Sequence, residues 1–309
     1  MQVLYFLQSI RTPILDAIMS FITTFGEETI VIVMAVLIFW CYSKKDGYYL
    51  IVVGFLGMII NQLLKIIFRI PRPWIIDKNF EIVESAREQA TGYSFPSGHT
   101  QNAVGLFGAT ARFSKALWIR IACIALLLGV AFSRMYLGVH TPLDVGVSLL
   151  IGGALVFGIY PIFNKFYDND KVMGSIFLSI VILSVGTCVF ILTYNFPSDV
   201  DMNNINSGLY NSAKLIGSSI GLLVSFFIEK RYIKFETKAP ILAQVIKVVL
   251  GFLGIVIIKS LLKTPINFLF GEVFGGGVRY FLIITFAVIV WPLTFKYITK
   301  FIEKLTKRN

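Results

Sequence analysis

Apolar stretches of roughly twenty residues recur along the whole chain, and short polar segments separate them. The hydrocarbon core of a bilayer is about 30 Å thick, so a helix needs about 20 residues to cross it. We therefore expect an all-α, polytopic integral membrane protein. A soluble fold is excluded because too few polar residues remain to coat so many apolar stretches. Nine crossings are expected, at residues 29–43, 47–68, 99–114, 117–137, 142–162, 172–194, 209–228, 241–262 and 279–298.

These stretches divide the chain into three segments. Charged residues and a proline interrupt residues 1–28, which therefore suit a helix lying in the membrane interface rather than a span or a cleavable signal peptide. Residues 29–166 contain the polar motifs described below, and residues 170–309 predict about four additional C-terminal transmembrane helices. The apolar residues of the interfacial helix are Leu4, Phe6, Leu7, Ile10 and Ile14.

Composition agrees with a membrane protein and excludes two other classes. The chain is 56% hydrophobic and 15% charged, with a mean hydropathy of +0.79. The net charge of +11 does not indicate nucleic-acid binding, because basic residues at loop ends set the orientation of a membrane protein. Cys41, Cys123 and Cys188 lie inside apolar stretches and offer neither a disulfide framework nor zinc-ligand spacing.

Alternate loops differ in charge. One set, with the C-terminal tail, is basic and is expected to be cytoplasmic by the positive-inside rule. It holds Lys44, Lys45, Arg112, Lys115, Lys165, Lys171, Lys230, Arg231, Lys234, Lys238, Lys296, Lys300, Lys304, Lys307 and Arg308. The opposite set is acidic and holds Glu27, Glu28, Asp77, Glu81, Glu84, Glu88, Asp199 and Asp201. The polar motifs lie with the acidic set. The expected location is thus the cell membrane, with an extracytoplasmic site and a cytoplasmic C-terminus.

The first motif is Lys65 followed by Arg72-Pro73, near the outer end of the second expected crossing. Prolines on both sides of Arg72 restrict the backbone around it. Two cations at one end of a helix could bind an anion. Taken alone, Lys65 is better explained by a long side chain that reaches from a helix end to the interface.

The second motif is Pro96-Ser97-Gly98-His99, immediately before an apolar helix. Ser97 suits the N-cap position of that helix. A helix N-terminus offers unpaired N–H groups to an anion, and Gly98 lets the backbone approach it closely. A plain serine N-cap beside an interfacial histidine is the alternative.

The third motif runs from Ser133-Arg134 to His140 and Asp144. Thr141-Pro142 predicts a helix start, and a carboxylate four residues after His140 can reach one ring nitrogen and fix the tautomer. The other nitrogen would then be free to act as a nucleophile. An intramembrane ion pair with a purely structural role is the alternative.

Together the three motifs use both histidines of the chain. The pattern Lys-x6-Arg-Pro, Pro-Ser-Gly-His, Ser-Arg-x5-His-x3-Asp resembles the type 2 phosphatidic acid phosphatase (PAP2) superfamily over about residues 20–165. The resemblance implies a PAP2-like helical core in which His140 attacks phosphorus, Asp144 orients it and His99 acts as acid and base. It further implies that the phosphate oxygens are held by Lys65, Arg72, Ser97, Gly98 and Arg134. We expect these residues to surround one tetrahedral anion.

Phosphoryl transfer needs mainly positioning and charge neutralisation from a protein. Three fixed cations can supply this, and the sequence offers no carboxylate cluster for Mg²⁺. We therefore expect no metal and no cofactor, and an activity that survives EDTA.

The expected substrate is a lipid-linked phosphate or pyrophosphate: a polyprenyl pyrophosphate such as undecaprenyl pyrophosphate, phosphatidic acid or phosphatidylglycerol phosphate. It would reach the site from the bilayer, beneath a charged loop (residues 74–95) whose Trp74, Phe80 and Tyr93 also suit simple interfacial anchors. A soluble sugar phosphate, as in the glucose-6-phosphatase branch, and transfer of the phosphoryl group to another acceptor stay open. So do a non-catalytic phospholipid-binding or transport protein and assembly into a homo-oligomer.

Two features of the last third fall outside the motifs. Lys247 and Lys259 lie within one apolar stretch and indicate either snorkelling with packing, or a polar cavity or a partner contact. Residues 271–279, with four glycines, predict a flexible outer loop rather than a phosphate cradle.

Overall fold

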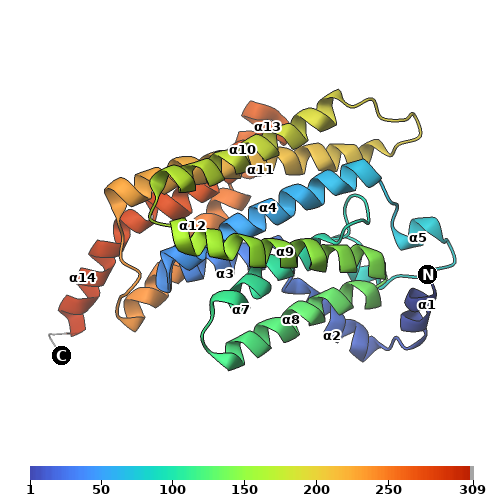
Figure 1. The fold of residues 1–309 in the computed structure, drawn as a ribbon, viewed down its shortest axis with the longest axis horizontal. Coiled ribbons are helices and arrows are strands. Elements are labelled where there is room, and N and C mark those ends of the chain that lie inside the picture. The colour runs from blue at the N-terminus through green and yellow to red at the C-terminus, as the bar shows by residue number, and fades with distance from the viewer. Residues whose placement is uncertain (307–309) are drawn as a thin grey trace. The chain divides into compact units, whose positions relative to one another are not determined.

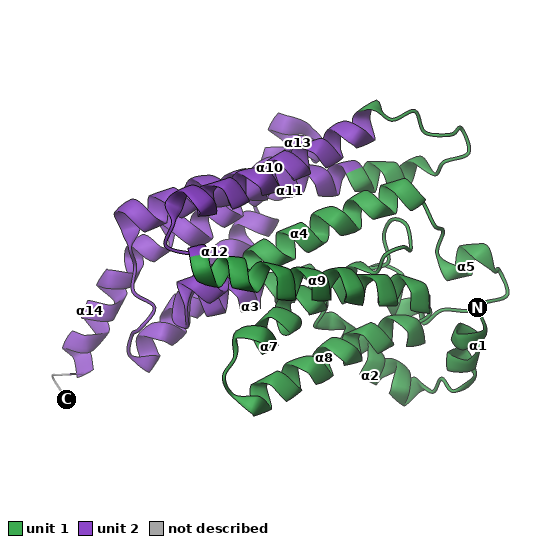
Figure 2. Cartoon of the chain, viewed as in Figure 1, with its two compact units in different colours: residues 1–32, 49–165, 193–208 green, residues 33–48, 166–192, 209–309 purple. Residues whose placement is uncertain are grey.

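The computed structural model describes residues 1–306, and these form helices joined by loops, with no strand among them (Figure 1). The chain divides into two compact units, coloured separately in Figure 2. Unit 1 comprises Met1–Ile32, Tyr49–Lys165 and Thr193–Gly208, and unit 2 comprises Val33–Tyr48, Phe166–Leu192 and Leu209–Asn309.

In chain order, the helices are α1 (Gln2–Ser9), α2 (Pro13–Thr24), α3 (Glu28–Cys41), α4 (Lys44–Phe68), α5 (Pro73–Ile76), η1 (Glu84–Ala86), α6 (Gly98–Ala103), η2 (Val104–Gly108), α7 (Ala109–Phe113), α8 (Leu117–Tyr136), α9 (Pro142–Phe166), α10 (Asp170–Thr193), α11 (Met202–Ile228), η3 (Glu229–Ile233), α12 (Ile241–Ser260), α13 (Lys263–Thr285), η4 (Phe286–Val290), η5 (Pro292–Thr294) and α14 (Phe295–Thr306).

Helix starts follow the local sequence. Thr12 caps α2 by accepting a hydrogen bond from the Leu15 N–H, and Pro13 follows it at the first helical position. Ser97 caps α6 in the same way, with the Thr100 N–H as donor. Pro142 begins α9. The helix starts expected at Ser97 and at Thr141-Pro142 are therefore confirmed.

Unit 1 is built around α8, which packs against α2 and against the run α6–η2–α7. Small residues allow close approach: a Cβ at Gly26 would lie 2.8 Å from the His99 carbonyl oxygen, and one at Gly152 would lie 2.5 Å from Val104 Cγ1. Helix α1 lies against the loop before α6, where Leu4 is buried with Phe80. Phe80 is therefore a packing residue and not an interfacial anchor.

Unit 2 contains most of α10–α14. Its interior is aromatic, with Phe39, Tyr48 and Phe226 in successive edge-to-face contacts. Helices α11 and α13 touch through their backbones, because a Cβ at Gly217 would lie 1.9 Å from the Gly277 carbonyl oxygen. Small residues permit such approach between membrane helices.

Seven helical segments of the described chain are long and apolar enough to cross a membrane. They are Lys44–Ile76, Leu117–Tyr136, Pro142–Phe166, Asp170–Thr193, Met202–Ile233, Ile241–Ser260 and Lys263–Thr306. An eighth results if α2 and α3, bent by 47° at their junction, count as one span. The protein is thus an all-α, multi-span membrane protein, and the four helices expected after residue 170 are confirmed.

The prediction of nine crossings is not confirmed at two of them. Helix α3 has 14 residues, and the crossing expected at 99–114 falls on α6, η2 and α7, which together span only Gly98–Phe113. Neither reaches the roughly 20 residues that a bilayer requires. Lys307 and Arg308, which belong to the basic tail, lie outside the described residues.

The prediction of a flexible loop at residues 271–279 is wrong. These residues belong to α13, which is kinked at Gly271 (φ 74°) and then continues as a helix. Gly275 and Gly276 are buried, and Gly277 lies against the backbone of Ala213. Gly276 and Gly277 therefore serve packing against Tyr210 and Ala213 of α11.

Candidate active site

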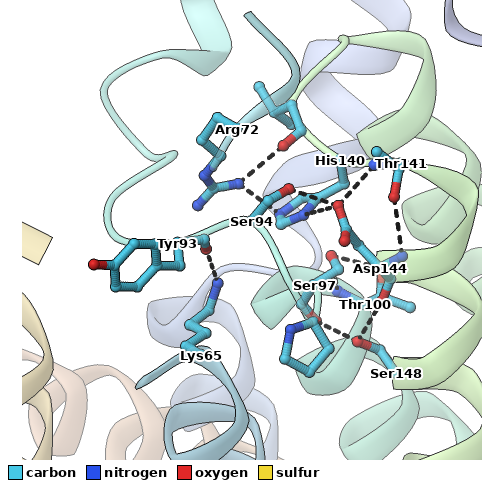
Figure 3. Close-up of polar contacts among 12 residues, drawn as sticks. Lys65, Arg72, Tyr93, Ser94, Ser97, Thr100, His140, Thr141, Asp144 and Ser148 are labelled. Atoms are coloured by element: carbon cyan, nitrogen blue, oxygen red, sulfur yellow. Dashed lines mark hydrogen bonds and ion pairs between the residues drawn. The ribbon is translucent and has the colours of Figure 1, made fainter. Parts of the chain in front are cut away.

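His140 lies in the turn between α8 and α9, and Figure 3 shows its ring between two charged partners. On one side, Asp144 Oδ2 lies 3.4 Å from His140 Nδ1. On the other, Arg72 Nη1 lies 2.9 Å from His140 Nε2. A guanidinium only donates, so Nε2 must accept and Nδ1 carries the proton toward Asp144. The lone pair of the imidazole therefore lies on Nε2.

Asp144 is held by more than His140. Its Oδ2 atom accepts hydrogen bonds from Ser94 Oγ (2.6 Å) and from the Thr141 N–H (2.7 Å). The Asp144 side chain is 1% exposed. Several donors hold a buried carboxylate in a fixed position. It can thus orient the ring of His140 and balance a positive charge that develops there.

The second and third motifs are joined through backbone and hydroxyl contacts. The Ser97 N–H donates to the Asp144 carbonyl oxygen over 3.1 Å. Ser148 Oγ, one turn further along α9, contacts the carbonyl oxygens of both Ser97 (2.9 Å) and Asp144 (3.0 Å). These bonds fix the start of α6 against the start of α9.

Ser97 and Gly98 form the N-terminal turn of α6. Ser97 is fully buried, and its Oγ accepts from Thr100 Oγ1 (3.0 Å) as well as from the Thr100 N–H. The hydroxyl hydrogen of Ser97 is left to donate elsewhere, since both of these contacts are donated to it. A Cβ at Gly98 would meet only Asn61 Oδ1, at 3.9 Å.

Three cations from separate segments lie near enough to act electrostatically on both histidines: Lys65, Arg72 and Arg134. Arg72 donates through Nε to the Gly92 carbonyl oxygen (3.1 Å) and through Nη2 to that of Thr91 (2.8 Å). Lys65 Nζ donates to the Tyr93 carbonyl oxygen. The loop before α6 therefore supplies carbonyl oxygens that hold both side chains in place.

Arg134, in the last turn of α8, is the third cation and is fully buried. Its Nη1 donates to Thr23 Oγ1 over 2.7 Å. Its Nε and Nη2 atoms, in contrast, have no hydrogen-bond partner among the described residues. Unpaired donors on a buried guanidinium are costly unless an anion joins them.

His99 is positioned by residues from two other segments. Its Nε2 lies 3.3 Å from Gln89 Oε1, and Gln89 Nε2 donates to Glu27 Oε1 over 2.8 Å. Gln89 thus links the ring of His99 to a carboxylate just before α3.

Burial, followed by the nearby charges of Arg72, Arg134 and Lys65, lowers the pKa of His140 well below its usual value of 6.5. The ring is therefore neutral at physiological pH. A neutral imidazole with a fixed tautomer is the form that can act as a nucleophile.

Each residue expected at the site lies in unit 1, and the contacts above bring the first and third motifs together at His140 and the second and third at Asp144. Residues 1–306 contain no group of three or more His, Cys, Asp or Glu side chains that could hold a metal ion. The chemistry available to this arrangement is attack by a neutral imidazole on a centre with anionic oxygens, surrounded by fixed cations.

Four residues that hold this arrangement were not predicted. They are Thr23, Gln89, Ser94 and Ser148. Ser148 lies one helical turn after Asp144 and could have been found by that spacing. The other three lie in helix ends or irregular loops, where no periodic pattern marks them.

Two family models match the chain. That of the PAP2 superfamily matches residues 46–168, and that of the PAP2 superfamily phosphatase transmembrane extension matches residues 213–302.

Three curated relatives each match about half of the chain. Undecaprenyl-diphosphatase BcrC of Bacillus subtilis is 30% identical over 162 residues, which cover 51% of this chain and 78% of that protein. Undecaprenyl-diphosphatase of Sulfolobus acidocaldarius is 29% identical over 144 residues, 46% of this chain and 68% of that protein. Phosphatidylglycerophosphatase B of Bacillus subtilis is 29% identical over 163 residues, 48% and 75% respectively. No solved structure matches the chain.

Proposed function

The chain belongs to the PAP2 superfamily of phosphatases, and from this premise we propose that it hydrolyses a lipid-linked phosphate or pyrophosphate through a phosphohistidine. The proposal is supported above all by one geometry: His140 lies with Nδ1 3.4 Å from Asp144 and with Nε2 2.9 Å from Arg72. A purely phosphate-binding protein needs cations but has no need of an oriented, neutral imidazole among them.

In the first step, the lone pair of His140 Nε2 attacks phosphorus while the bond between phosphorus and the leaving oxygen breaks. His99, protonated once the anionic substrate lies beside it, gives this proton to that oxygen and becomes a neutral imidazole. The imidazole becomes positively charged as it loses its lone pair to phosphorus, and Asp144 stabilises this charge through the Nδ1 proton. Arg72 must turn from Nε2 toward the equatorial oxygens, where Arg134 and Lys65 join it.

In the second step, His99 accepts a proton from water, whose oxygen attacks phosphorus as the bond to Nε2 breaks. Inorganic phosphate leaves, and both rings return to their initial protonation states. Two displacements through a covalent intermediate replace one harder displacement. For a pyrophosphate substrate the leaving group is the lipid monophosphate, which departs more easily than an alkoxide.

Among lipid phosphates, we favour a polyprenyl pyrophosphate, because two of the relatives named above are undecaprenyl-diphosphatases. Phosphatidylglycerol phosphate comes next on the same ground. We further propose that residues 29–166 form the catalytic core and residues 170–309 a separate extension, in line with the two family matches. The charge distribution of the loops supports an extracytoplasmic site and a cytoplasmic C-terminus.

The test is phosphate release by detergent-purified protein, measured on a panel of undecaprenyl pyrophosphate, phosphatidylglycerol phosphate, phosphatidic acid and glucose 6-phosphate. We expect turnover of a lipid substrate, and a loss of about 10³-fold or more in His140→Ala. The matched variant His99→Ala keeps the nucleophile. With a substrate that has a good leaving group it should accumulate an acid-labile, alkali-stable phosphoenzyme, which His140→Ala cannot form. Turnover that persists in His140→Ala would overturn the mechanism.

A further inference from the structure

A buried cation in the C-terminal extension has no ion-pair partner among residues 1–306. Arg279, on α13, is 3% exposed. Its Nη2 donates to the Tyr210 hydroxyl on α11 over 2.7 Å. Its Nε and Nη1 atoms are fully buried and have no hydrogen-bond partner in the described part of the chain. Only one of the three guanidinium nitrogens thus has a hydrogen-bond acceptor among the described residues, and that acceptor, the Tyr210 hydroxyl, is neutral.

An arginine in this state is unfavourable within a membrane protein. An ionisable side chain inside a membrane bundle normally pairs with an opposite charge or lines a functional site. Arginine cannot escape by losing its proton, because its pKa is too high. Two ion pairs in unit 2, Lys44–Glu229 and Lys230–Asp170, show this pairing, and neither involves Arg279.

A second cation lies beside Arg279. The ammonium of Lys214 is 5.7 Å from the centroid of the Tyr210 ring and 4.5 Å from that of Tyr280. Tyr210 is thus a neighbour of both cations: its hydroxyl accepts a hydrogen bond from Arg279, and the Lys214 ammonium lies over its ring. Lys214 is partly exposed whereas Arg279 is buried. An anion could therefore first contact the partly exposed ammonium of Lys214 and then reach the guanidinium of Arg279.

The helices that carry this cluster are held rigidly. Gly217, seven residues after Tyr210, is in backbone contact with Gly277, two residues before Arg279. A Cβ at Gly276 would lie 2.7 Å from the Tyr210 ring. The close contact of α11 and α13 thus places Tyr210, Lys214 and Arg279 together without a flexible loop. Binding sites on rigid helices lose little entropy when they are occupied.

We propose that Arg279, Lys214 and Tyr210 form a second anion site, separate from the catalytic residues, that binds a phosphate group. Arginine suits phosphate because its planar array of donors matches the phosphate oxygens. Lys214 adds a second positive charge on a long, flexible side chain. The phosphate group is either the headgroup of an anionic lipid or free inorganic phosphate. All three residues belong to unit 2, and the site does not depend on the proposed catalytic function.

The experiment follows thermal unfolding of the full-length protein in detergent. Three additions are titrated separately: inorganic phosphate, phosphatidylglycerol in mixed micelles, and zwitterionic phosphatidylcholine as the lipid control. We expect phosphate or phosphatidylglycerol to raise the unfolding temperature of the wild type and phosphatidylcholine to raise it less. In Arg279→Gln the concentration that gives half of the shift should rise about tenfold or more, as loss of a charge-assisted hydrogen bond implies.

Controls separate this site from the catalytic one. Phosphate that binds at His140 stabilises wild type and Arg279→Gln equally, so only the difference between them reports the second site. Arg231→Gln makes the same chemical change at an exposed arginine of unit 2 and should respond like the wild type. Without any anion, Arg279→Gln should unfold at a temperature no lower than the wild type, since it loses an uncompensated buried charge.

The two sources give different results. A response of the wild type to inorganic phosphate that Arg279→Gln loses identifies free phosphate as the ligand, whereas one confined to phosphatidylglycerol identifies a lipid headgroup. Lys214→Gln keeps the buried arginine and should also weaken the rise in unfolding temperature that the anion causes. This variant tests the proposal if Arg279→Gln does not fold. Equal responses of wild type, Lys214→Gln and any folded Arg279→Gln protein to both anions would overturn the proposal.

Discussion

At the scale of single residues, the imidazole of His140 determines how the site should depend on pH. Its pKa is lowered in the folded protein, first by burial and then by three cations. The unfolded chain restores the usual value of 6.5. Below pH 6.5 the imidazole of His140 therefore binds a proton in the unfolded state but not in the folded state. The free energy of unfolding then falls as the pH falls. Above pH 6.5 both states are neutral and this contribution is constant.

We expect the unfolding temperature of the anion-free protein to fall below about pH 6.5, with a contribution from His140 of at most about 1.4 kcal/mol per pH unit. His140→Asn removes this titration and should show a flatter profile. The measurement is thermal unfolding of both proteins in detergent between pH 5 and 8. Parallel profiles over that range would contradict the assigned protonation state.

The residues of the three motifs could be predicted, whereas several of their partners could not. His140 and Asp144 are four residues apart, so helical geometry alone brings them close. Ser94 contacts the same carboxylate from 50 residues away, and Gln89 reaches His99 from an irregular loop. Such partners depend on how the loop before α6 folds back, which no local pattern in the sequence encodes.

At the scale of helices, one glycine on α9 controls the distance between two motifs. A Cβ at Gly152 would lie 2.5 Å from Val104 Cγ1 and 2.7 Å from Val104 Cβ, and Val104 is a buried β-branched residue of η2. Its stiff side chain has few rotamers with which to give way. Helix α9 also carries Asp144, and η2 continues from the helix capped by Ser97. A methyl group at position 152 should therefore move Asp144 away from Ser97.

The neighbouring Gly153 provides a matched control, since a Cβ there meets no atom within 4 Å. Both Gly→Ala changes gain about 1 kcal/mol of helix propensity. Gly152→Ala should in addition lose about 1–3 kcal/mol from overpacking and lower the rate of phosphate release. Gly153→Ala should be at least as stable as the wild type and equally active. Thermal unfolding and turnover of the two variants, compared side by side, test this; similar behaviour would exclude a special role for Gly152.

The helices of the first half were predicted in position but not always in length. Periodicity and caps locate α6 and α9 correctly at Ser97 and Pro142. The sequence does not reveal that α3 and the run α6–η2–α7 stop short of a full crossing, because buried short helices are as apolar as spans. In the second half, glycines that pack α13 against α11 were mistaken for loop residues, since close helix packing and flexibility both favour glycine.

At the scale of the whole molecule, orientation in the membrane is the property that the loop charges predict most directly. Basic residues cluster in the loops of one side and in the tail, and the candidate site lies with the acidic loops. The proposed substrate would then be hydrolysed outside the cytoplasm. Orientation can be measured without any assay of activity.

We expect a cysteine at Lys78, in the loop before α6, to react with a membrane-impermeant maleimide in intact cells, and one at Lys300, on α14, to react only after the membrane is broken. Both are introduced after Cys41, Cys123 and Cys188 are replaced by serine. The reverse pattern would place the site in the cytoplasm and reject the orientation, while leaving the catalytic proposal intact.

The hydrogen bond between Arg72 and His140 has a consequence for how the resting enzyme reacts with other molecules. A guanidinium that occupies the only lone pair of the ring masks it from stray electrophiles. A substrate with anionic oxygens attracts the same guanidinium and so unmasks the ring on arrival. Under the proposed mechanism, the negative charge of the substrate draws Arg72 away and makes Nε2 of His140 available for attack. An uncharged reagent leaves the hydrogen bond between Arg72 and His140 in place.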